Sequence, residues 1–258
     1  LWSNSETNHT ISNLPAGTYT VSISDSNSCT ISESASINQA NDTLQISILN
    51  ATNNICNGET NGSIDIIAQG GTMPYTYLWS NAETTANISN LPAGFYSIEI
   101  TDLNSCIANQ SIEITEPAEV SIQANISNLL CFEDNTGAID ITVSGGTPMY
   151  SYLWANGQTN EDIQNLDIGI YNITVTDINA CTAESSLAIT QPDSISLSLD
   201  YNQFLCYGMN NGYINPIVSG GTVPYNFVWT NGETNENISN LEAGTYSDTI
   251  SDINGCST

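Results

Sequence analysis

The residues best suited to chemistry form an Asp-x-Asn-x-Cys turn that occurs four times in the chain. Each copy places two side-chain oxygens two residues apart with backbone carbonyls between them, which is part of the oxygen set that calcium requires. An Asx turn without an ion is the alternative, and we favour it because Asp and Asn side chains readily accept backbone hydrogen bonds. Calcium is the one candidate cofactor, with candidate ligands Asp25, Asn27, Asp102, Asn104, Asp177, Asn179, Asp252 and Asn254.

Residues for catalysis are scarce. His9 is the only histidine, and lysine is absent, so neither a repeated Ser/His/Asp arrangement nor a lysine nucleophile is available. Carboxylate pairs can support glycoside hydrolysis, but the acids are scattered over a repeated sequence, which argues against such a site. We therefore predict no catalytic residues and no enzymatic activity.

The charge balance excludes several classes of partner. The chain has 27 acidic residues and no Lys or Arg, which gives a formal net charge of −27. Nucleic-acid binding and attraction to anionic lipid both depend on Lys and Arg, so neither partner is expected. The sequence also has no apolar run of about 18 residues, so we expect no membrane insertion.

These turns belong to a longer unit that repeats. Trp2, Trp79, Trp154 and Trp229 recur at a nearly constant spacing, and their neighbours recur with them. A period of about 75 residues is typical of a tandem array. We predict a partial module at 1–40, holding only the back half, and modules at 41–117, 118–192 and 193–258, the last without the end of its final strand. A chain that opens inside a module is interpreted as an excerpt from a longer array.

The seven cysteines follow the repeat in two classes. The start-class cysteines, near the beginning of a module, are Cys56, Cys131 and Cys206, and the end-class cysteines, which close the Asp-x-Asn-x-Cys turns, are Cys29, Cys106, Cys181 and Cys256. Either class of thiol lacks zinc-ligand spacing. Disulfide bonds are therefore expected, and these place the chain in an oxidising, extracytoplasmic setting.

The spacing leaves two pairings open. Pairing within a module closes loops of about 50 residues, for which the chain-entropy relation predicts a stabilisation of about 4 kcal/mol. We expect this arrangement. It gives Cys56–Cys106, Cys131–Cys181 and Cys206–Cys256 and leaves Cys29 without its partner. The alternative closes shorter loops across the module junctions, as Cys106–Cys131 and Cys181–Cys206, and leaves Cys256 unpaired.

The elements that position these residues are strands. Apolar residues alternate with polar ones, as in Ile64, Ile66 and Ala68, and Gly-Gly-Thr and Asn-Gly clusters punctuate the chain. Six or seven short strands per module, a lone Trp and a Leu-x-x-Gly-x-Tyr corner predict an immunoglobulin-like sandwich. The expected core residues are Trp2, Trp79, Trp154 and Trp229 with the corner tyrosines Tyr19, Tyr96, Tyr171 and Tyr246. A sugar-stacking tryptophan ladder is the alternative interpretation of the tryptophans.

The last module departs from the pattern at two positions. Asp248 stands where the other copies have Val21, Ile98 and Ile173, so an inward carboxylate predicts a bulge, a protonated acid or a nearby cation. Pro216 replaces an isoleucine in a central strand, where proline fits poorly, and is expected to interrupt it.

The order of these motifs resembles a known family. Gly-Gly-Thr-x-Pro-Tyr-x-Tyr-x-Trp spans Gly70 to Trp79 and, with Phe227 in place of the second Tyr, Gly220 to Trp229; Ile-Ser-Asn-Leu-x-Ala-Gly-x-Tyr and Asp-x-Asn-x-Cys follow. The succession is similar to the SprB-type repeat of very large surface adhesins in gliding Bacteroidota, over essentially the whole chain. The resemblance implies an immunoglobulin-like (PKD-like) fold, export by type IX secretion, and a role in adhesion or gliding.

Three short sequences look like the acceptor for O-glycosylation in the same bacteria. They begin with Asp42, Asp193 and Asp248, and their candidate modified residues are Thr43, Ser194 and Thr249. By strand alternation, Thr249 is expected to point outward.

Together these features predict an all-β chain of tandem immunoglobulin-like modules of about 75 residues, arranged as an extended rod. The expected function is a structural or adhesive stalk of a secreted adhesin at the extracellular cell surface. The alternatives are a subunit of a self-assembling filament or surface layer, and a carbohydrate-binding array. The expected partners are neighbouring repeats, other copies of the protein and surface polysaccharide.

Overall fold

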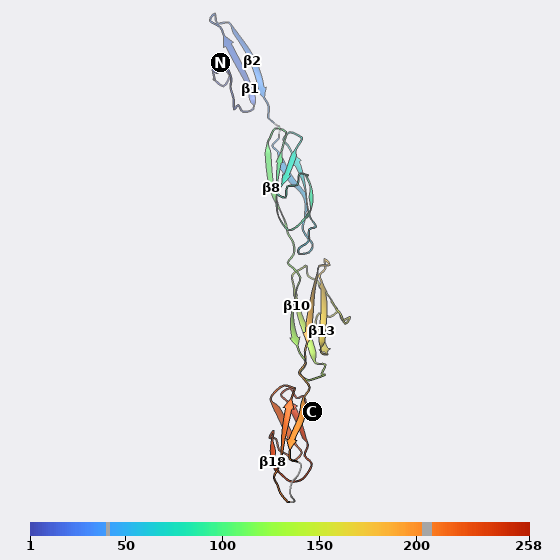
Figure 1. Ribbon diagram of the computed structural model, residues 1–258. Coiled ribbons are helices and arrows are strands. Elements are labelled where there is room, and N and C mark those ends of the chain that lie inside the picture. The colour runs from blue at the N-terminus through green and yellow to red at the C-terminus, as the bar shows by residue number, and fades with distance from the viewer. Residues whose placement is uncertain (40–41, 203–207) are drawn as a thin grey trace. The chain divides into compact units, whose positions relative to one another are not determined.

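The computed structural model describes residues 1–39, 42–202 and 208–258, and within them every regular element is a β-strand (Figure 1). The candidate disulfide residue Cys206 lies outside the described residues. The predicted all-β fold class is confirmed.

Each complete module contains six strands in two antiparallel sheets of three. In residues 41–117, one sheet has the order β3 (Gln45–Thr52), β4 (Gly62–Gln69), β6 (Ile88–Leu91), and the other β5 (Thr76–Trp79), β7 (Gly94–Thr101), β8 (Ile107–Ile114). In residues 118–192, the corresponding sheets are β9 (Ser121–Ser127), β10 (Gly137–Ser144), β12 (Ile163–Leu166) and β11 (Ser151–Trp154), β13 (Gly169–Thr176), β14 (Thr182–Ile189). The first, second and fourth strands of a module face the third, fifth and sixth, as in an immunoglobulin-like sandwich.

The two flanking segments are smaller versions of the same plan. Residues 193–258 form one sheet of β15 (Ser196–Tyr201), β16 (Gly212–Ser219) and β18 (Ile238–Leu241) and a second of β17 (Tyr225–Trp229) and β19 (Asp248–Asp252). The described residues 1–39 form the hairpin of β1 (Gly17–Ser24) and β2 (Thr30–Ile37), with an isolated bridge from Trp2 to Val21, and none of their side chains belongs to a buried cluster.

Alternation along the strands builds the cores. Along β7 the inward residues Tyr96, Ile98 and Ile100 are buried while their neighbours face outward. Trp79 is 2% exposed, Trp154 1% and Trp229 3%, and Trp2, whose module has only two strands, is half-buried. Each indole nitrogen donates to a backbone carbonyl six residues further on, so burial leaves no indole N–H unsatisfied.

The corner tyrosines recur with the same hydrogen bond. Each hydroxyl donates to the carbonyl four residues upstream, at 2.9 Å for Tyr19, 2.9 Å for Tyr96, 3.0 Å for Tyr171 and 3.2 Å for Tyr246. This bond fixes the turn that leads into β7 and its counterparts, as the tyrosine corner does in immunoglobulin-like domains.

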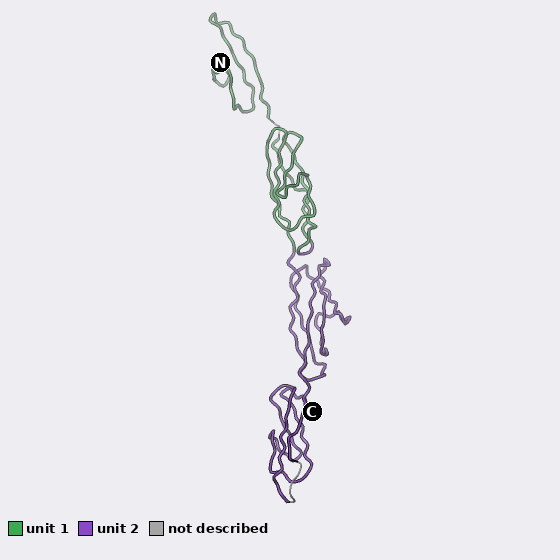
Figure 2. Tube along the Cα trace, viewed as in Figure 1, with its two compact units in different colours: residues 1–54, 58–116 green, residues 55–57, 117–258 purple. Residues whose placement is uncertain are grey.

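The chain divides into two compact units, coloured separately in Figure 2. One contains residues 1–54 and 58–116, and the other contains residues 117–258 together with the loop 55–57. The loop is thus part of the second unit, although the strands on either side of it belong to the first.

Pro216 does not interrupt its strand, contrary to expectation. β16 runs unbroken from Gly212 to Ser219, the same length as β4 and β10. The counterparts of Pro216 show why: the Ile66 N–H donates to Oδ1 of the Asn87 side chain at 3.2 Å, and the Ile141 N–H donates to Oδ1 of Asp162 at 3.0 Å. The backbone N–H that proline lacks is thus one that bonds to a side chain in the other modules.

Asp248 points inward, as its position in the strand predicted. It pairs with Trp229 in β19, as Ile98 pairs with Trp79, and its Oδ2 is buried without a hydrogen-bond partner among the described residues. Burial raises the pKa of this carboxyl. β19 begins only at Asp248, whereas β7 begins at Gly94, so the strand is also shorter than its counterpart.

Candidate functional site: the Asp-x-Asn-x-Cys turns and their disulfides

One aspartate organises each Asp-x-Asn-x-Cys turn. Asp102 Oδ1 accepts from the N–H groups of Asn104 at 2.9 Å and Cys106 at 2.8 Å, while Oδ2 accepts from the Thr72 N–H at 2.9 Å. Asp177 and Asp252 make the same three bonds in their own modules. Each aspartate therefore fixes its turn against the Gly-Gly-Thr segment of its own module.

The Gly-Gly-Thr segment is glycine-rich because two groups approach it closely. A Cβ on Gly71, which has a φ of +63°, would lie 2.8 Å from Asp102 Oδ2. A Cβ on Gly70 would overlap the carbonyl of Thr43, just before the first strand. Close approaches to the same two groups occur at the glycine pairs of the next two modules. The pair is thus required where the first strand, the Gly-Gly-Thr segment and the aspartate meet.

The aspartates stay charged although they are buried. Asp102 is 5% exposed, Asp177 4% and Asp252 2%. The N–H of Cys106 lowers the pKa of Asp102 most, and the N–H of Thr147 does so for Asp177. Burial raises the pKa of Asp252, but its N–H donors outweigh that effect and the pKa is lowered. Backbone N–H groups thus compensate the buried charge in a chain without Lys or Arg.

The turns do not fit a calcium site. Both carboxylate oxygens of Asp102 face N–H donors, and Asn104 Nδ2 donates to Thr72 Oγ1 at 2.9 Å. Within the described ranges, no group of three or more His, Cys, Asp or Glu side chains could hold a metal. The Asx turn accounts for the motif through its protein hydrogen bonds alone.

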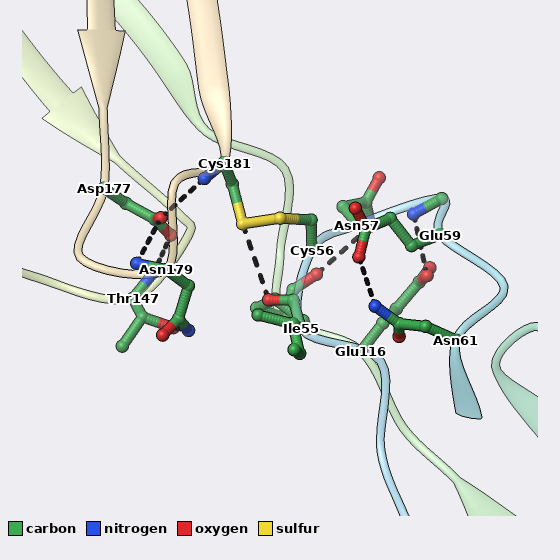
Figure 3. The surroundings of a disulfide bond; sticks show 12 residues. Ile55, Cys56, Asn57, Glu59, Asn61, Glu116, Thr147, Asp177, Asn179 and Cys181 are labelled. Carbon is green, nitrogen blue, oxygen red and sulfur yellow. Dashed lines mark hydrogen bonds between the residues drawn. A yellow bond between two sulfur atoms is a disulfide. The ribbon is translucent and has the colours of Figure 1, made fainter. Parts of the chain in front are cut away.

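Two disulfides join four of the six described cysteines, and neither expected pairing is correct. Cys56 pairs with Cys181 and Cys131 with Cys256, each over 125 residues with Cα atoms 5.5 Å apart. A start-class cysteine therefore bonds to the end-class cysteine of the following module. Figure 3 shows the first pair, with Cys181 closing the turn of Asp177 and Cys56 reaching it from the loop 55–57.

The direction of the strands explains why pairing within a module fails. The chain enters β3 beside its own turn, because the Asp42 carbonyl accepts from the Gly71 N–H at 3.0 Å. It then runs the eight residues of β3, about 27 Å, before it reaches Cys56. Cys56 and Cys106 thus lie at opposite ends of one sandwich, too far apart for a disulfide.

Both partners of the observed bond lie at the junction between residues 117 and 118. Beside Cys56, Asn57 Nδ2 donates to the Pro117 carbonyl at 3.2 Å. In the module of Cys181, the Gly146 N–H donates to the Ala118 carbonyl at 2.7 Å. The alternative pairing is also wrong, because Cys131 pairs with Cys256, Cys181 pairs with Cys56, and Cys106 is free.

The second disulfide has the same surroundings. Sγ of Cys256 lies 3.2 Å from the Leu130 carbonyl oxygen, as Sγ of Cys181 lies 3.5 Å from that of Ile55. Asn254 Nδ2 also donates to the Leu130 carbonyl at 3.2 Å. The residue before each of these start-class cysteines thus places its carbonyl against the next module's turn.

Cys29 and Cys106 are free and exposed. In the observed staggered pairing, an end-class cysteine bonds to the start-class cysteine of the preceding module. For Cys106 that module is residues 1–40, whose one cysteine is the end-class Cys29. Desolvation and the negative charge of Asp102 raise the pKa of the Cys106 thiol. The turn around Asp25 forms without a disulfide, with its N–H bonds from Asn27 and Cys29 at 2.8 and 2.9 Å.

The candidate glycosylation residues are all exposed. Thr43 and Ser194 lie just before the first strands of their modules, and Thr249 lies in β19 between Asp248 and the buried Ile250, so it points outward. Their modification stays a prediction.

Comparison with known families explains the repeated succession. The family described as SprB repeat matches residues 48–84, 123–159 and 200–234. Three segments of the chain therefore match the SprB repeat. Each match runs from the first strand past the core tryptophan and includes a start-class cysteine, whereas the end-class cysteines lie outside the matched segments. The staggered disulfide therefore joins one SprB repeat to the closing turn of the next module.

Several solved structures are similar to the chain. Three N-terminal domains of the outer capsid protein Hoc of bacteriophage RB49 are 16% identical, with a TM-score of 0.40 over 83% of this chain and 84% of that one. The eight N-terminal immunoglobulin domains of the Down syndrome cell adhesion molecule are 14% identical, with a TM-score of 0.34 over 96% and 40%. A tetra-tandem repeat from the extending region of a large adhesion protein is 12% identical, with a TM-score of 0.31 over 96% and 74%. No curated protein matches the chain.

These findings show a chain with three segments similar to the SprB repeat and with disulfides of the kind formed in oxidising compartments. None of the described elements is a helix with the length and apolar character to cross a membrane.

Proposed function

We propose that this chain is a segment of the structural and adhesive stalk of a very large secreted adhesin, exposed at the cell surface and used in attachment or gliding. The observation that carries the proposal is the pair of disulfides that join the first two segments matching the SprB repeat to the modules that follow them. Disulfides at this regular stagger suit a chain that must stay intact outside the cell, where the surroundings are oxidising.

The chemistry of the surface supports a non-enzymatic role. The buried aspartates are engaged in backbone hydrogen bonds, and the single histidine occurs in one module only. The core tryptophans Trp79, Trp154 and Trp229 are buried and cannot stack on sugars, which disfavours the tryptophan-ladder alternative. Recognition of a surface polysaccharide would then fall to the loops, and export by type IX secretion belongs to the same proposal.

Labelling of intact cells tests the proposal. Antibodies against residues 41–258 should stain unpermeabilised cells of the source organism, and cells without the gene should attach or spread less. Antibodies against a cytoplasmic protein, which should not stain, control for lysis. Full attachment and spreading by the deletion strain would contradict the stalk function.

A self-assembling filament is the second candidate, because exposed apolar residues recur at equivalent positions. Leu103, Ile178 and Ile253 follow the turn aspartates and are 63%, 53% and 58% exposed. Met73, Met149 and Val223 are exposed in the loops that begin with Gly-Gly-Thr. Three matching apolar sites at a regular spacing would suit lateral contacts with other copies. Sedimentation that shows only monomer at millimolar concentration would exclude this candidate.

A further inference from the structure

We propose that the staggered disulfides form a tension-limiting covalent route along the array, so that neither a module nor a junction between modules depends on its backbone alone. The inference deepens the stalk function and rests on it only for the source of the tension. The covalent route itself follows from the pairing.

The two disulfide-closed loops overlap. One spans residues 56–181 and the other residues 131–256. Every peptide bond from Cys56 to Cys256 is therefore bypassed by at least one disulfide, and those between Cys131 and Cys181 are bypassed by both. The disulfides therefore set the maximum length to which the chain can be extended, whatever the stability of the cores.

Pairing within modules would protect the array differently. Bonds such as Cys56–Cys106 would bypass each module body but leave the stretch from Cys106 to Cys131 as a single backbone connection. The observed stagger closes this gap, because the Cys56–Cys181 bond spans the junction at residues 117–118. The junction is the part of a tandem array with the fewest buried contacts, so it gains most from a second covalent route.

The shortest backbone segment that joins the two disulfides runs from Cys131 to Cys181 and contains β10, β11, β12 and β13. The segments from Cys56 to Cys131 and from Cys181 to Cys256 are longer, so they remain slack when the shortest route is fully extended. The segment 131–181, which extends to roughly 170 Å, therefore limits the extension even when its module unfolds.

A single engineered cleavage site tests the bypass of the junction. The chain has no Lys or Arg, so Glu119→Lys, at an exposed position, gives trypsin its only site. After digestion, the non-reduced chain should migrate as one intact species and separate into two fragments only after reduction. The matched control Gln39→Lys lies outside both loops and should release residues 1–39 without reduction. Separation of the Glu119→Lys fragments without reductant would overturn the proposal.

Single-molecule pulling between residues 1 and 258 tests the limit on extension. The shortest covalent route, through both disulfides, contains about 110 residues, so the oxidised chain should extend to roughly 370 Å and the reduced chain to roughly 900 Å. The variant Cys56→Ser/Cys131→Ser should extend like the reduced chain. A wild-type chain that extends to the reduced length without reductant would contradict the limit.

Pairing within modules predicts the same extended length for the unmodified chain as the staggered pairing does. The variant Cys106→Ser distinguishes the two pairings. Because Cys106 is free, this variant should keep the short extension. A gain of about 50 residues, or roughly 170 Å, would show pairing within modules and contradict the covalent route proposed. Neither pulling nor digestion depends on adhesion, so a negative result leaves the stalk function open to its own test.

Discussion

The turns around Asp102 and Asp177 have the same hydrogen bonds but carry cysteines in different states. Cys106 is free and exposed, whereas Cys181 is 8% exposed and bonded to Cys56. The three N–H bonds to the aspartate measure 2.9, 2.9 and 2.8 Å in the first turn and 2.7, 2.9 and 2.9 Å in the second. The aspartate and the Gly-Gly-Thr segment therefore build the turn, and the loop of the preceding module adds the disulfide.

Removal of the disulfide should have the largest effect and should distinguish the two turns. Cys56→Ser/Cys181→Ser opens a loop of 125 residues, which the chain-entropy relation values at about 5 kcal/mol. Cys106→Ser removes no bond and should change the free energy of unfolding by less than about 0.5 kcal/mol. Urea unfolding followed by tryptophan fluorescence measures both. Equal losses for the two variants would contradict the assignment of Cys106 as free.

Gly146→Ala should break the turn itself. This glycine has a φ of +59°, and an added Cβ would lie 2.7 Å from Asp177 Oδ2 and 2.6 Å from Val120 Cγ2. We expect a loss of about 2 to 3 kcal/mol in the free energy of unfolding, from the backbone strain and the displaced carboxylate. The control Gly157→Ala has a similar φ, +86°, but open space around it, and should cost only about 1 kcal/mol. Thermal unfolding of the two variants compares them directly.

Asp248→Ile should stabilise the last module at neutral pH by about 1 to 2 kcal/mol, because it removes a buried oxygen without a partner. The pKa of Asp248 is raised in the fold, so its carboxylate destabilises the native state above that folded pKa. The penalty disappears as the pH falls below the unfolded value near 4, where the group is protonated in both states. The stabilisation by Asp248→Ile should therefore shrink from pH 7 to pH 4. A gain that does not vary with pH would indicate packing alone.

Calcium and EDTA should have the smallest effect. Because N–H groups face the turn carboxylates, neither millimolar calcium nor EDTA should shift the melting temperature by more than about 1 °C. Differential scanning calorimetry at constant ionic strength makes the comparison, with magnesium as the control cation. A rise of several degrees with calcium alone would restore the calcium interpretation.

Local patterns predicted most of the fold. The alternation around Ile64 indicated the strands, and the spacing of Trp79 and Tyr96 indicated the sandwich and its corner, because these features depend on near neighbours in the sequence. The Asx turn was also predicted from Asp102 and Asn104 alone. The inward position of Asp248 was also predicted by alternation, and its Oδ2 is buried.

The disulfides could not be read from spacing in the same way. The sequence separation between two cysteines says nothing about which end of a sandwich each one occupies, and β3 carries Cys56 a full strand length from its own turn. The contact between Asp42 and Gly71 orients the first strand and so decides which end of the sandwich Cys56 occupies, but this contact cannot be recognised in the linear sequence. Pro216 was misjudged for a related reason, since the direction of one N–H decided whether a proline fits.

Non-reducing peptide mapping of the purified chain tests the staggered disulfide pairing. Digestion at Asp and Glu after alkylation of free thiols, followed by mass spectrometry, should recover peptides that link Cys56 to Cys181 and Cys131 to Cys256, with Cys29 and Cys106 alkylated. Recovery of Cys56 linked to Cys106 and of Cys131 linked to Cys181 would contradict the staggered pairing and the covalent route built on it.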